Sequence, residues 1–149
     1  MKSQFKHYLK FVALLSVVVG LVACGGGEVG DSGAAGGSPR IALEAQTLEL
    51  GDMPNGEIAE REVAVRNDGD APLVISTITT SCGCTTAALE PMTIAPGTSG
   101  TLRVTFDSGA HGPDLRGLIM REVMIVSNDP ATPEAVVEVR ADILAPVTE

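Results

Sequence analysis

The sequence predicts an all-β domain in which two sheets pack as a sandwich, and three observations support this prediction. From Ile41 onward, apolar residues recur at every second position, which is typical of antiparallel strands with one buried and one solvated face. Clusters of Gly, Pro, Asn and Asp separate these apolar runs. No stretch combines an apolar period of 3.6 residues with helix caps at both ends.

Strands are expected wherever the alternation is regular, and some seven of them over residues 41–149 suit an immunoglobulin-like sandwich. The regular runs contain Leu48 and Leu50, Val63 and Val65, Leu102, Val104 and Phe106, and Val137, Val139, Ala141 and Ile143. Turns are expected at 67–70, 95–97, 111–114 and 128–133, the first of them as a hairpin turn.

Two runs depart from regular alternation. Between Leu73 and Ser81, the apolar residue Ile78 follows Ile75 by three positions instead of two, which predicts a β-bulge that re-aims the chain before the next motif. The run from Leu118 to Val126 alternates less cleanly. It is expected to be either a strand that is buried on both faces or one that a bulge interrupts.

Length and charge restrict the functions that the chain can have. Its 149 residues are enough for one ordinary domain and a leader. Beyond residue 23, seven arginines stand against nineteen carboxylates, a formal charge of −12. Such an acidic body repels a phosphate backbone, so we expect no nucleic-acid partner. Phe106 is the only aromatic residue after Cys24, which also argues against stacking platforms for bases.

The first 23 residues have the pattern of a secretory signal peptide. A basic start, which ends at Lys10, is followed by an uncharged and mostly apolar stretch from Phe11 to Ala23. A membrane-spanning helix needs roughly 20 apolar residues, and this stretch is shorter. We therefore expect the segment to direct export and to be removed.

The residues Leu21-Val22-Ala23-Cys24 resemble the lipobox of bacterial lipoproteins. The resemblance implies that Cys24 becomes the first mature residue and carries acyl chains such as palmitate, which would hold the protein on a membrane. The resemblance also implies that a residue other than Asp after the lipidated cysteine favours sorting to the outer membrane. Gly25 therefore implies a protein that is held on the outer membrane and faces the periplasm. The glycine-rich residues 24–40 are expected to form a flexible tether.

Five short motifs together resemble one bacterial family, that of domain of unknown function 1573. The motifs are Asn67-Asp68-Gly69-Asp70-Ala71-Pro72-Leu73-Val74-Ile75, Ser81-Cys82-Gly83-Cys84-Thr85-Thr86, Ile94-Ala95-Pro96-Gly97, Val104-Thr105-Phe106-Asp107 and Val126-Ser127-Asn128-Asp129-Pro130. The resemblance covers roughly residues 48–143 and implies a fold similar to immunoglobulin-like domains of the major-sperm-protein and Hydin type. It also implies an exported protein, often a lipoprotein, with no established reaction.

The pair Cys82-Gly83-Cys84 is the only constellation with reactive potential. In an extended strand the two Cα atoms would lie about 6.5–7 Å apart, near the upper limit for a disulfide, and the glycine permits a tighter turn. Three roles remain open: a local disulfide that shapes a turn, thiol–disulfide exchange, or a Cu(I) site with His111 or Met92 as a third ligand. Without such a role, His111 is expected to be an exposed loop residue.

Two functions from different classes follow. The first is a non-enzymatic interaction module that is anchored to a membrane and docks another envelope protein through a strand edge or a surface. The second is a thiol-centred function, soft-metal binding or thiol–disulfide exchange, at Cys82 and Cys84. A single histidine beyond the signal peptide leaves no Ser-His-Asp set to single out, so we expect no catalytic residue and no cofactor.

Overall fold

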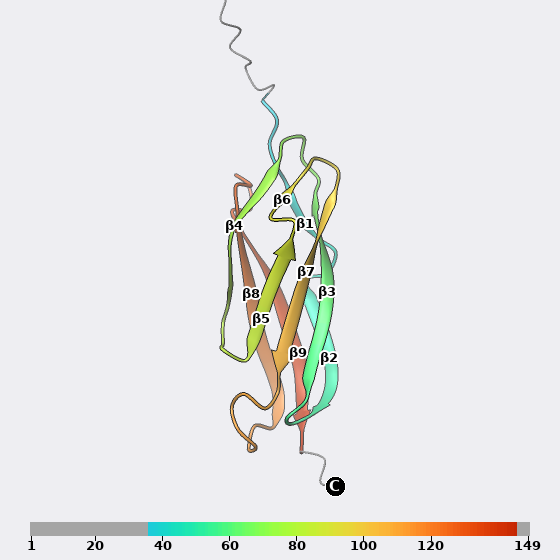
Figure 1. The fold of residues 1–149 in the computed structure, drawn as a ribbon, viewed down its shortest axis with the longest axis vertical. Helices are drawn as coiled ribbons and strands as arrows, with labels where there is room; N and C mark the ends of the chain where they lie inside the picture. The colour runs from blue at the N-terminus through green and yellow to red at the C-terminus, as the bar shows by residue number, and fades with distance from the viewer. Residues whose placement is uncertain (1–35, 146–149) are drawn as a thin grey trace, which may run out of the picture. The chain divides into compact units, whose positions relative to one another are not determined.

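The computed structural model describes residues 36–145, which form nine β-strands and no helix (Figure 1). The strands are β1 (Ile41–Leu43), β2 (Thr47–Pro54), β3 (Ile58–Asn67), β4 (Leu73–Thr80), β5 (Thr85–Glu90), β6 (Thr93–Ile94), β7 (Ser99–Asp107), β8 (Gly117–Ser127) and β9 (Glu134–Leu144). No helix that could cross a membrane is found within this range. The all-β prediction is confirmed. The signal peptide, Cys24 and most of the predicted tether lie outside the described residues.

The strands form two sheets. One has four strands in the order β1-β3-β7-β5, and the other has five in the order β2-β9-β8-β4-β6. All paired strands are antiparallel except β2 and β9, which are parallel. The expectation of antiparallel pairing is therefore wrong for this pair. Because β2 and β9 are distant in the sequence, no short turn forces them to run in opposite directions.

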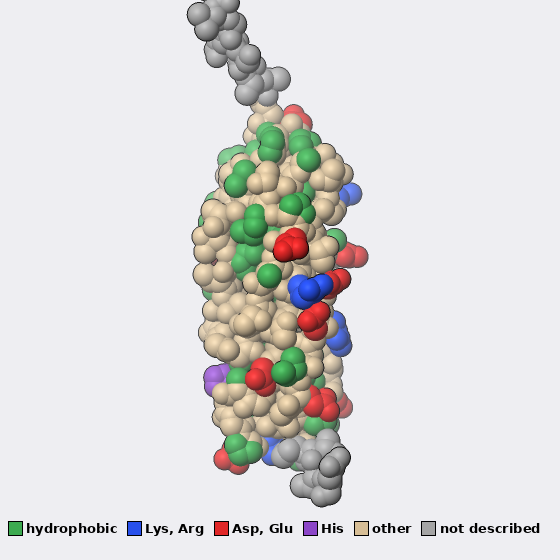
Figure 2. Space-filling model, in the orientation of Figure 1, with side chains coloured by type: hydrophobic (Ala, Val, Ile, Leu, Met, Phe, Trp, Pro, Cys, Tyr) green, Lys and Arg blue, Asp and Glu red, His purple; other side chains and the backbone are tan. Residues whose placement is uncertain are grey.

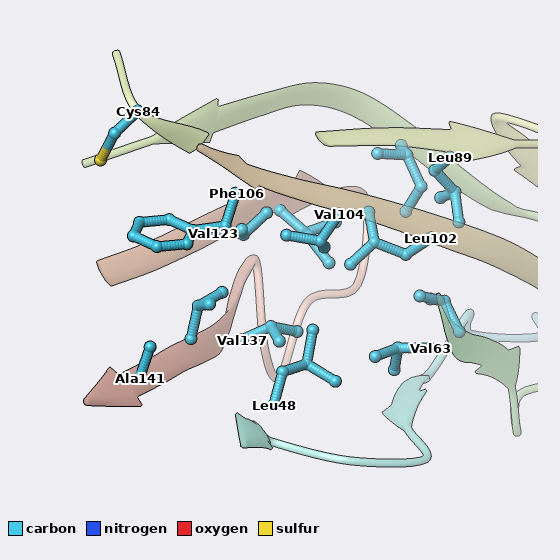
Figure 3. Packing of buried hydrophobic residues seen from close by; sticks show 14 of the residues in the cluster. Leu48, Val63, Cys84, Leu89, Leu102, Val104, Phe106, Val123, Val137 and Ala141 are labelled. Carbon is cyan, nitrogen blue, oxygen red and sulfur yellow. The ribbon is translucent and has the colours of Figure 1, made fainter. Parts of the chain in front are cut away.

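Both sheets bury alternate residues in one common core. Along β7 and β9, buried and more accessible positions alternate, as the sequence predicts. Leu102, Val104 and Phe106 from one sheet belong to the same cluster as Val123 and Val137 from the other (Figure 3). Burial of each large aliphatic or aromatic side chain contributes about 1.5–3 kcal/mol, so this shared core holds the two sheets together.

The number of strands is nine, and the expected number of seven is wrong. The strands that the alternation did not reveal are short or poor in large side chains: β1 has three residues, β6 has two, and β5 consists mostly of Thr and Ala. Each of them is paired with a longer strand, β1 with β3, β6 with β4, and β5 with β7. Strand formation here depends on that pairing, because local propensity is weak over so few residues.

The run from Leu118 to Val126 takes neither of its two expected forms. It lies in β8, which pairs with β9 without any shift of register. The core side of β8 carries Ile119, Val123 and Ile125, whereas Leu118 and Met120 are exposed. The weak alternation thus reflects apolar residues on a solvent-facing surface, not double burial.

The bulge expected in β4 is confirmed. The register between β4 and β8 shifts between Ile75 and Thr77, so Ile75 and Ile78 both lie on the core side although they are three residues apart. After Thr80 the chain leaves the five-stranded sheet and enters β5 of the four-stranded sheet at Thr85. The cysteine motif is therefore the crossover between the two sheets.

Polar side chains organise one end of the domain, which we call the Asn67 end. It comprises residues 38–40 and the loops at 67–72, 95–98 and 128–133. The side chain of the fully buried Asn67 accepts hydrogen bonds from the N–H groups of Arg40 and Gly69 and donates to the carbonyls of Ala71 and Ile94. The turn at 67–70 joins strands of different sheets, so the prediction of a hairpin turn is wrong.

Asp129 anchors β1 at the same end. Its buried carboxylate accepts hydrogen bonds from the N–H groups of Ile41, Ala131 and Thr132. Burial raises the pKa of this carboxyl, but these three hydrogen bonds and the nearby charge of Arg40 lower it further than burial raises it. The net pKa of Asp129 lies below its ordinary value, which means that folding favours the ionised form.

The predicted tether, residues 24–40, extends too far into the domain. The N–H of Ser38 donates to the Asp70 carboxylate at 2.7 Å, and the carbonyl of Arg40 accepts from the N–H of Asp68 at 2.8 Å. A Cβ atom placed on Gly69 would lie 2.6 Å from the backbone nitrogen of Arg40. Residues 38–40 therefore belong to the folded domain, and Gly69 is needed because the incoming chain passes so close.

Candidate functional site

The cysteine pair forms a disulfide in the crossover turn between β4 and β5. The Cα atoms of Cys82 and Cys84 are 5.3 Å apart, closer than in an extended strand, because residues 81–84 turn from one sheet to the other. Gly83 has no left-handed φ, and a Cβ atom placed on it would meet nothing within 4 Å. The tighter turn that the sequence analysis allowed for is present, but the backbone conformation at residue 83 does not require glycine.

Hydrogen bonds on both sides hold the crossover turn in place. Ser81 exchanges two bonds with Glu122 of β8: its N–H donates to the Glu122 carbonyl, and its hydroxyl accepts from the Glu122 N–H, both at 2.9 Å. The carbonyl of Cys84 accepts from the N–H of Asp107 at 2.8 Å. The Thr80 hydroxyl lies 3.0 Å from the Cys82 carbonyl. The position of the turn therefore does not depend on the disulfide alone.

The two sulfurs of the disulfide have different surroundings. Cys84 is only 3% exposed and belongs to the core cluster, where it lies at one edge (Figure 3), whereas Cys82 is half-buried. The hydroxyl of the buried Thr85 lies near both, 3.4 Å from Sγ of Cys82 and 3.8 Å from Sγ of Cys84. Of these two sulfurs, only Sγ of Cys84 also accepts a hydrogen bond from a cationic side chain among residues 36–145.

That cation is Arg121, which the sequence analysis did not single out. It lies at a core-facing position of β8, between Ile119 and Val123, and its Nε donates to Sγ of Cys84 at 3.4 Å. Its Nη1 donates to the carbonyl of Met120 at 2.8 Å. An arginine at an inward-facing position of a strand was the signal in the sequence, because such a charge needs a partner inside the fold.

His111 reaches the same place from the loop between β7 and β8. One of its ring nitrogens and the two cysteine sulfurs all lie within 4.8 Å of one another, although the residue itself is exposed, as expected. The loop is fixed by the buried Asn55, whose side-chain nitrogen donates to the carbonyls of Gly112 and Leu115. The structure thus brings Cys82, Cys84 and His111 together.

Met92 does not join this cluster. Its carbonyl accepts a hydrogen bond from the N–H of Ile75 in the first half of β4, far along the strand from the crossover turn. Two thiolates and one imidazole would therefore be the donor set for a soft cation such as Cu(I). While the sulfurs are bonded to each other they cannot act as thiolates, so metal binding would require reduction first.

A second feature is an apolar surface on the outer face of the five-stranded sheet. Leu118 and Met120 are 86% and 56% exposed, and both line a hollow of about 600 Å³ together with Glu49, Asp52 and Asp142. Asp52 and Asp142 are directly opposite in the β2–β9 register, an arrangement in which like charges repel. The surface, which we call the Leu118 surface, is therefore apolar with an acidic rim.

The outer face of the four-stranded sheet has a different character. There Arg103 of β7 pairs with Glu60 at 3.1 Å and with Glu62 at 2.9 Å, both from β3. Acidic and basic side chains lie beside one another along this side of the molecule, with apolar side chains scattered between them (Figure 2). Arg103 thus has two carboxylate partners on this face.

The family described as "Protein of unknown function (DUF1573)" matches residues 41–143. No curated protein matches the chain. Among solved structures, a protein of unknown function from Porphyromonas gingivalis W83 is similar with a TM-score of 0.61 and 27% identity, over 70% of this chain and 46% of that one. The chain therefore spans less than half the length of that protein.

Two further structures share the fold at lower identity. The ASH/PapD-like domain 7 of human CEP192 has a TM-score of 0.55 and 10% identity, over 74% of this chain and 89% of that one. The VesB protease of Vibrio cholerae has a TM-score of 0.56 and 16% identity, over 68% of this chain and 31% of that one. At such identities the likeness concerns the fold alone.

Proposed function

Since the chain belongs to the DUF1573 family, as its motifs predict, we propose that it is an exported lipoprotein whose domain is a non-enzymatic interaction module of the cell envelope. In this proposal Cys24 carries the lipid, residues up to about 37 tether the domain, and the two sheets form an immunoglobulin-like sandwich. The protein faces the periplasm from the outer membrane.

The observation that carries this proposal is the exposure of Leu118 and Met120. Contiguous exposed apolar residues with a polar rim are typical of surfaces that bind another protein. The rim has the acidic residues Glu49, Asp52 and Asp142, while Arg140 is paired with Glu49 and Glu138. The partner that fits is an envelope protein with apolar side chains flanked by basic ones.

A site-specific crosslink tests this module. The full chain, with its own leader, carries a photoreactive amino acid in place of Met120 and is irradiated in intact cells. Ile58 is the matched control position, because it is 68% exposed but lies on β3 of the other sheet. We expect one crosslinked adduct from position 120 and none from 58, and loss of the adduct when Leu118→Glu is added. Equal crosslinking at both positions would exclude the Leu118 surface.

The anchor has its own test. Replacement of Cys24 by Ser removes the thiol that a thioether to diacylglycerol needs, so labelling with radioactive palmitate is expected to disappear and the protein to leave the membrane fraction. Replacement of both Cys82 and Cys84 by Ser is the control and is expected to leave the label in place. Unlabelled wild-type protein would contradict the lipoprotein proposal.

The second candidate function is thiol-centred, and the cluster of Cys82, Cys84 and His111 favours it. Within it we propose thiol–disulfide exchange ahead of Cu(I) binding, because the sulfurs are already bonded to each other and a guanidinium faces one of them. Intact mass and metal content of the protein from its own envelope test this order. A mass two hydrogen atoms below that of the dithiol form, without copper, supports the disulfide that exchange requires, and reduction by dithiothreitol then tests exchange itself, whereas a stoichiometric copper ion supports metal binding.

A further inference from the structure

The two cysteines of the disulfide differ in their exposure to solvent. Cys82 is half-buried near the exposed His111, while Cys84 is almost fully buried against the core. Exchange begins when a thiolate attacks one sulfur and expels the other as a thiolate. An incoming thiol can approach Cys82 far more easily than Cys84.

The charge near the two sulfurs also favours Cys84 as the leaving group. Arg121 donates from Nε to Sγ of Cys84 at 3.4 Å, and a hydrogen bond from a guanidinium strengthens as charge develops on its acceptor. The Thr85 hydroxyl lies 3.4 Å from Sγ of Cys82 and 3.8 Å from Sγ of Cys84, but it is neutral, so the charged Arg121 dominates the difference between the two sulfurs. Access and charge stabilisation thus select the same direction of cleavage.

We propose that the Cys82–Cys84 disulfide is polarised for exchange with an exported dithiol, with Cys82 as the sulfur that is attacked and Cys84, beside Arg121, as the leaving group. This inference rests on the thiol-centred function proposed above and names its substrate class and the role of each residue. Arg121 contacts a reacting atom, so it is a catalytic residue for the exchange.

The step balances with the dithiol as reductant. Its thiolate forms a bond to Sγ of Cys82, the Cys82–Cys84 bond breaks, and the electron pair stays on Sγ of Cys84. The second thiol of the reductant, as a thiolate, then attacks the sulfur that is bonded to Cys82 and releases Cys82. The dithiol is oxidised to a disulfide, and the pair is reduced by two electrons. Both protons of the dithiol pass through solvent and reside on Cys82 and Cys84 when these are neutral thiols.

The turn is built to survive this step. Its bonds from Ser81 to Glu122 and from Asp107 to Cys84 involve backbone groups and a serine hydroxyl, not the sulfurs. The two thiols therefore stay close after reduction, which allows the disulfide to form again. The direction of the cycle is set by the redox state of the dithiol.

A trapping experiment tests the polarity. The full chain is treated with glutathione, a monothiol, and quenched with iodoacetamide, and each cysteine is then assigned by peptide mass. We expect glutathione on Cys82 and the alkyl group on Cys84. Glutathione on Cys84, or equal amounts on both, would overturn the polarity while leaving exchange itself intact.

The rate of reduction of the disulfide measures the contribution of Arg121. Reduction by dithiothreitol is expected to slow about tenfold in Arg121→Gln and to recover in part in Arg121→Lys, which keeps the charge. Arg116→Gln is the matched control, because Arg116 donates to the carbonyls of Pro113 and Leu115 in the nearby loop and, within the part of the chain that the structure describes, has no hydrogen bond to either sulfur. Circular dichroism checks that all variants fold. An unchanged rate in Arg121→Gln would overturn the role of Arg121.

A failure of the thiol-centred function itself gives a different result from a failure of the proposed polarity. If dithiothreitol in excess does not reduce the folded wild-type protein, the disulfide is a structural crosslink and the thiol-centred function falls together with the inference. If reduction proceeds but the glutathione adduct is on Cys84, only the inference falls. The interaction module at the Leu118 surface is independent of both results.

Discussion

The two ends of the domain use polar residues in different ways. At the Asn67 end, Asn67 and Asp129 direct their side chains to backbone groups of other loops, which ties residues 38–40 and β1 to the fold. The opposite end, which we call the Cys82 end, consists of the turn at 81–84 and the loop at 108–116. There a disulfide, a guanidinium and an imidazole gather. The first end stabilises the fold, and the second is the end at which we propose thiol–disulfide exchange.

Two glycines show the same contrast. Gly69 cannot carry a side chain because the backbone of Arg40 passes beside it, whereas the space around Gly83 is open. Both glycines belong to motifs that carry the family resemblance. A place in a family motif therefore does not show whether packing requires a glycine, as at Gly69, or whether the glycine lies between the two cysteines with open space around it, as at Gly83.

The largest expected effect is at Asn67. Replacement by Ala removes four hydrogen bonds of a fully buried side chain, two of them from backbone N–H groups and two to backbone carbonyls, so the free energy of unfolding should fall by about 3 kcal/mol. Urea unfolding measures the change. Thr86→Ala, at an exposed position of β5, is the control and should cost less than about 0.5 kcal/mol. A loss at Asn67 no greater than the control would remove the distinction between the ends.

The next effect is at Gly69. Replacement by Ala places a Cβ against the backbone of residues 38–40, and we expect a loss of about 2 kcal/mol because these atoms cannot move aside cheaply. Gly83→Ala is the matched control and should change stability by no more than about 0.5 kcal/mol, since nothing lies near the added atom. The same urea series measures both, and similar losses would contradict the contrast between the two glycines.

Loss of the disulfide should have a smaller effect. The bond closes a loop of only three residues, so replacement of both Cys82 and Cys84 by Ser is expected to lower stability by at most about 1.6 kcal/mol. Thermal and urea unfolding of the oxidised protein and the variant provide the comparison. A loss as large as that of Asn67→Ala would show that the Cys82 end is also a structural anchor.

The smallest effect is the pH dependence of Asp129. Its pKa is lower in the folded protein than the ordinary 3.8, so the ionised carboxylate adds stability that is fully present above that value and is lost as the pH falls through the folded pKa. Asp129→Asn should therefore be less stable than wild type by about 1 kcal/mol at pH 7, with the difference shrinking in acid. Unfolding between pH 7 and pH 3 measures it, and a constant difference would contradict the assignment.

The cluster of Cys82, Cys84, His111 and Arg121 was only partly predictable. The spacing of Cys82 and Cys84 placed both in one motif, and the Gly/Pro composition around His111 placed it in an exposed loop. That the loop lies against the turn follows from the Asn55 side chain, which bonds to residues 57 and 60 positions away in the chain. Arg121 was missed because its contact with Cys84 spans 37 residues and depends on the register between β4 and β8.

The sequence by itself determined the all-β class, the β4 bulge and the family, because alternation with a period of two and short turn motifs are local properties. Only the tertiary structure decided the parallel β2–β9 pair, the three short strands and the exposure of Leu118 and Met120. The tertiary structure also decided that the guanidinium of Arg121 lies beside Sγ of Cys84. The physical reason is that each of these features depends on pairing between residues far apart in the chain, and an apolar side chain looks the same in a sequence whether a neighbouring strand covers it or water does.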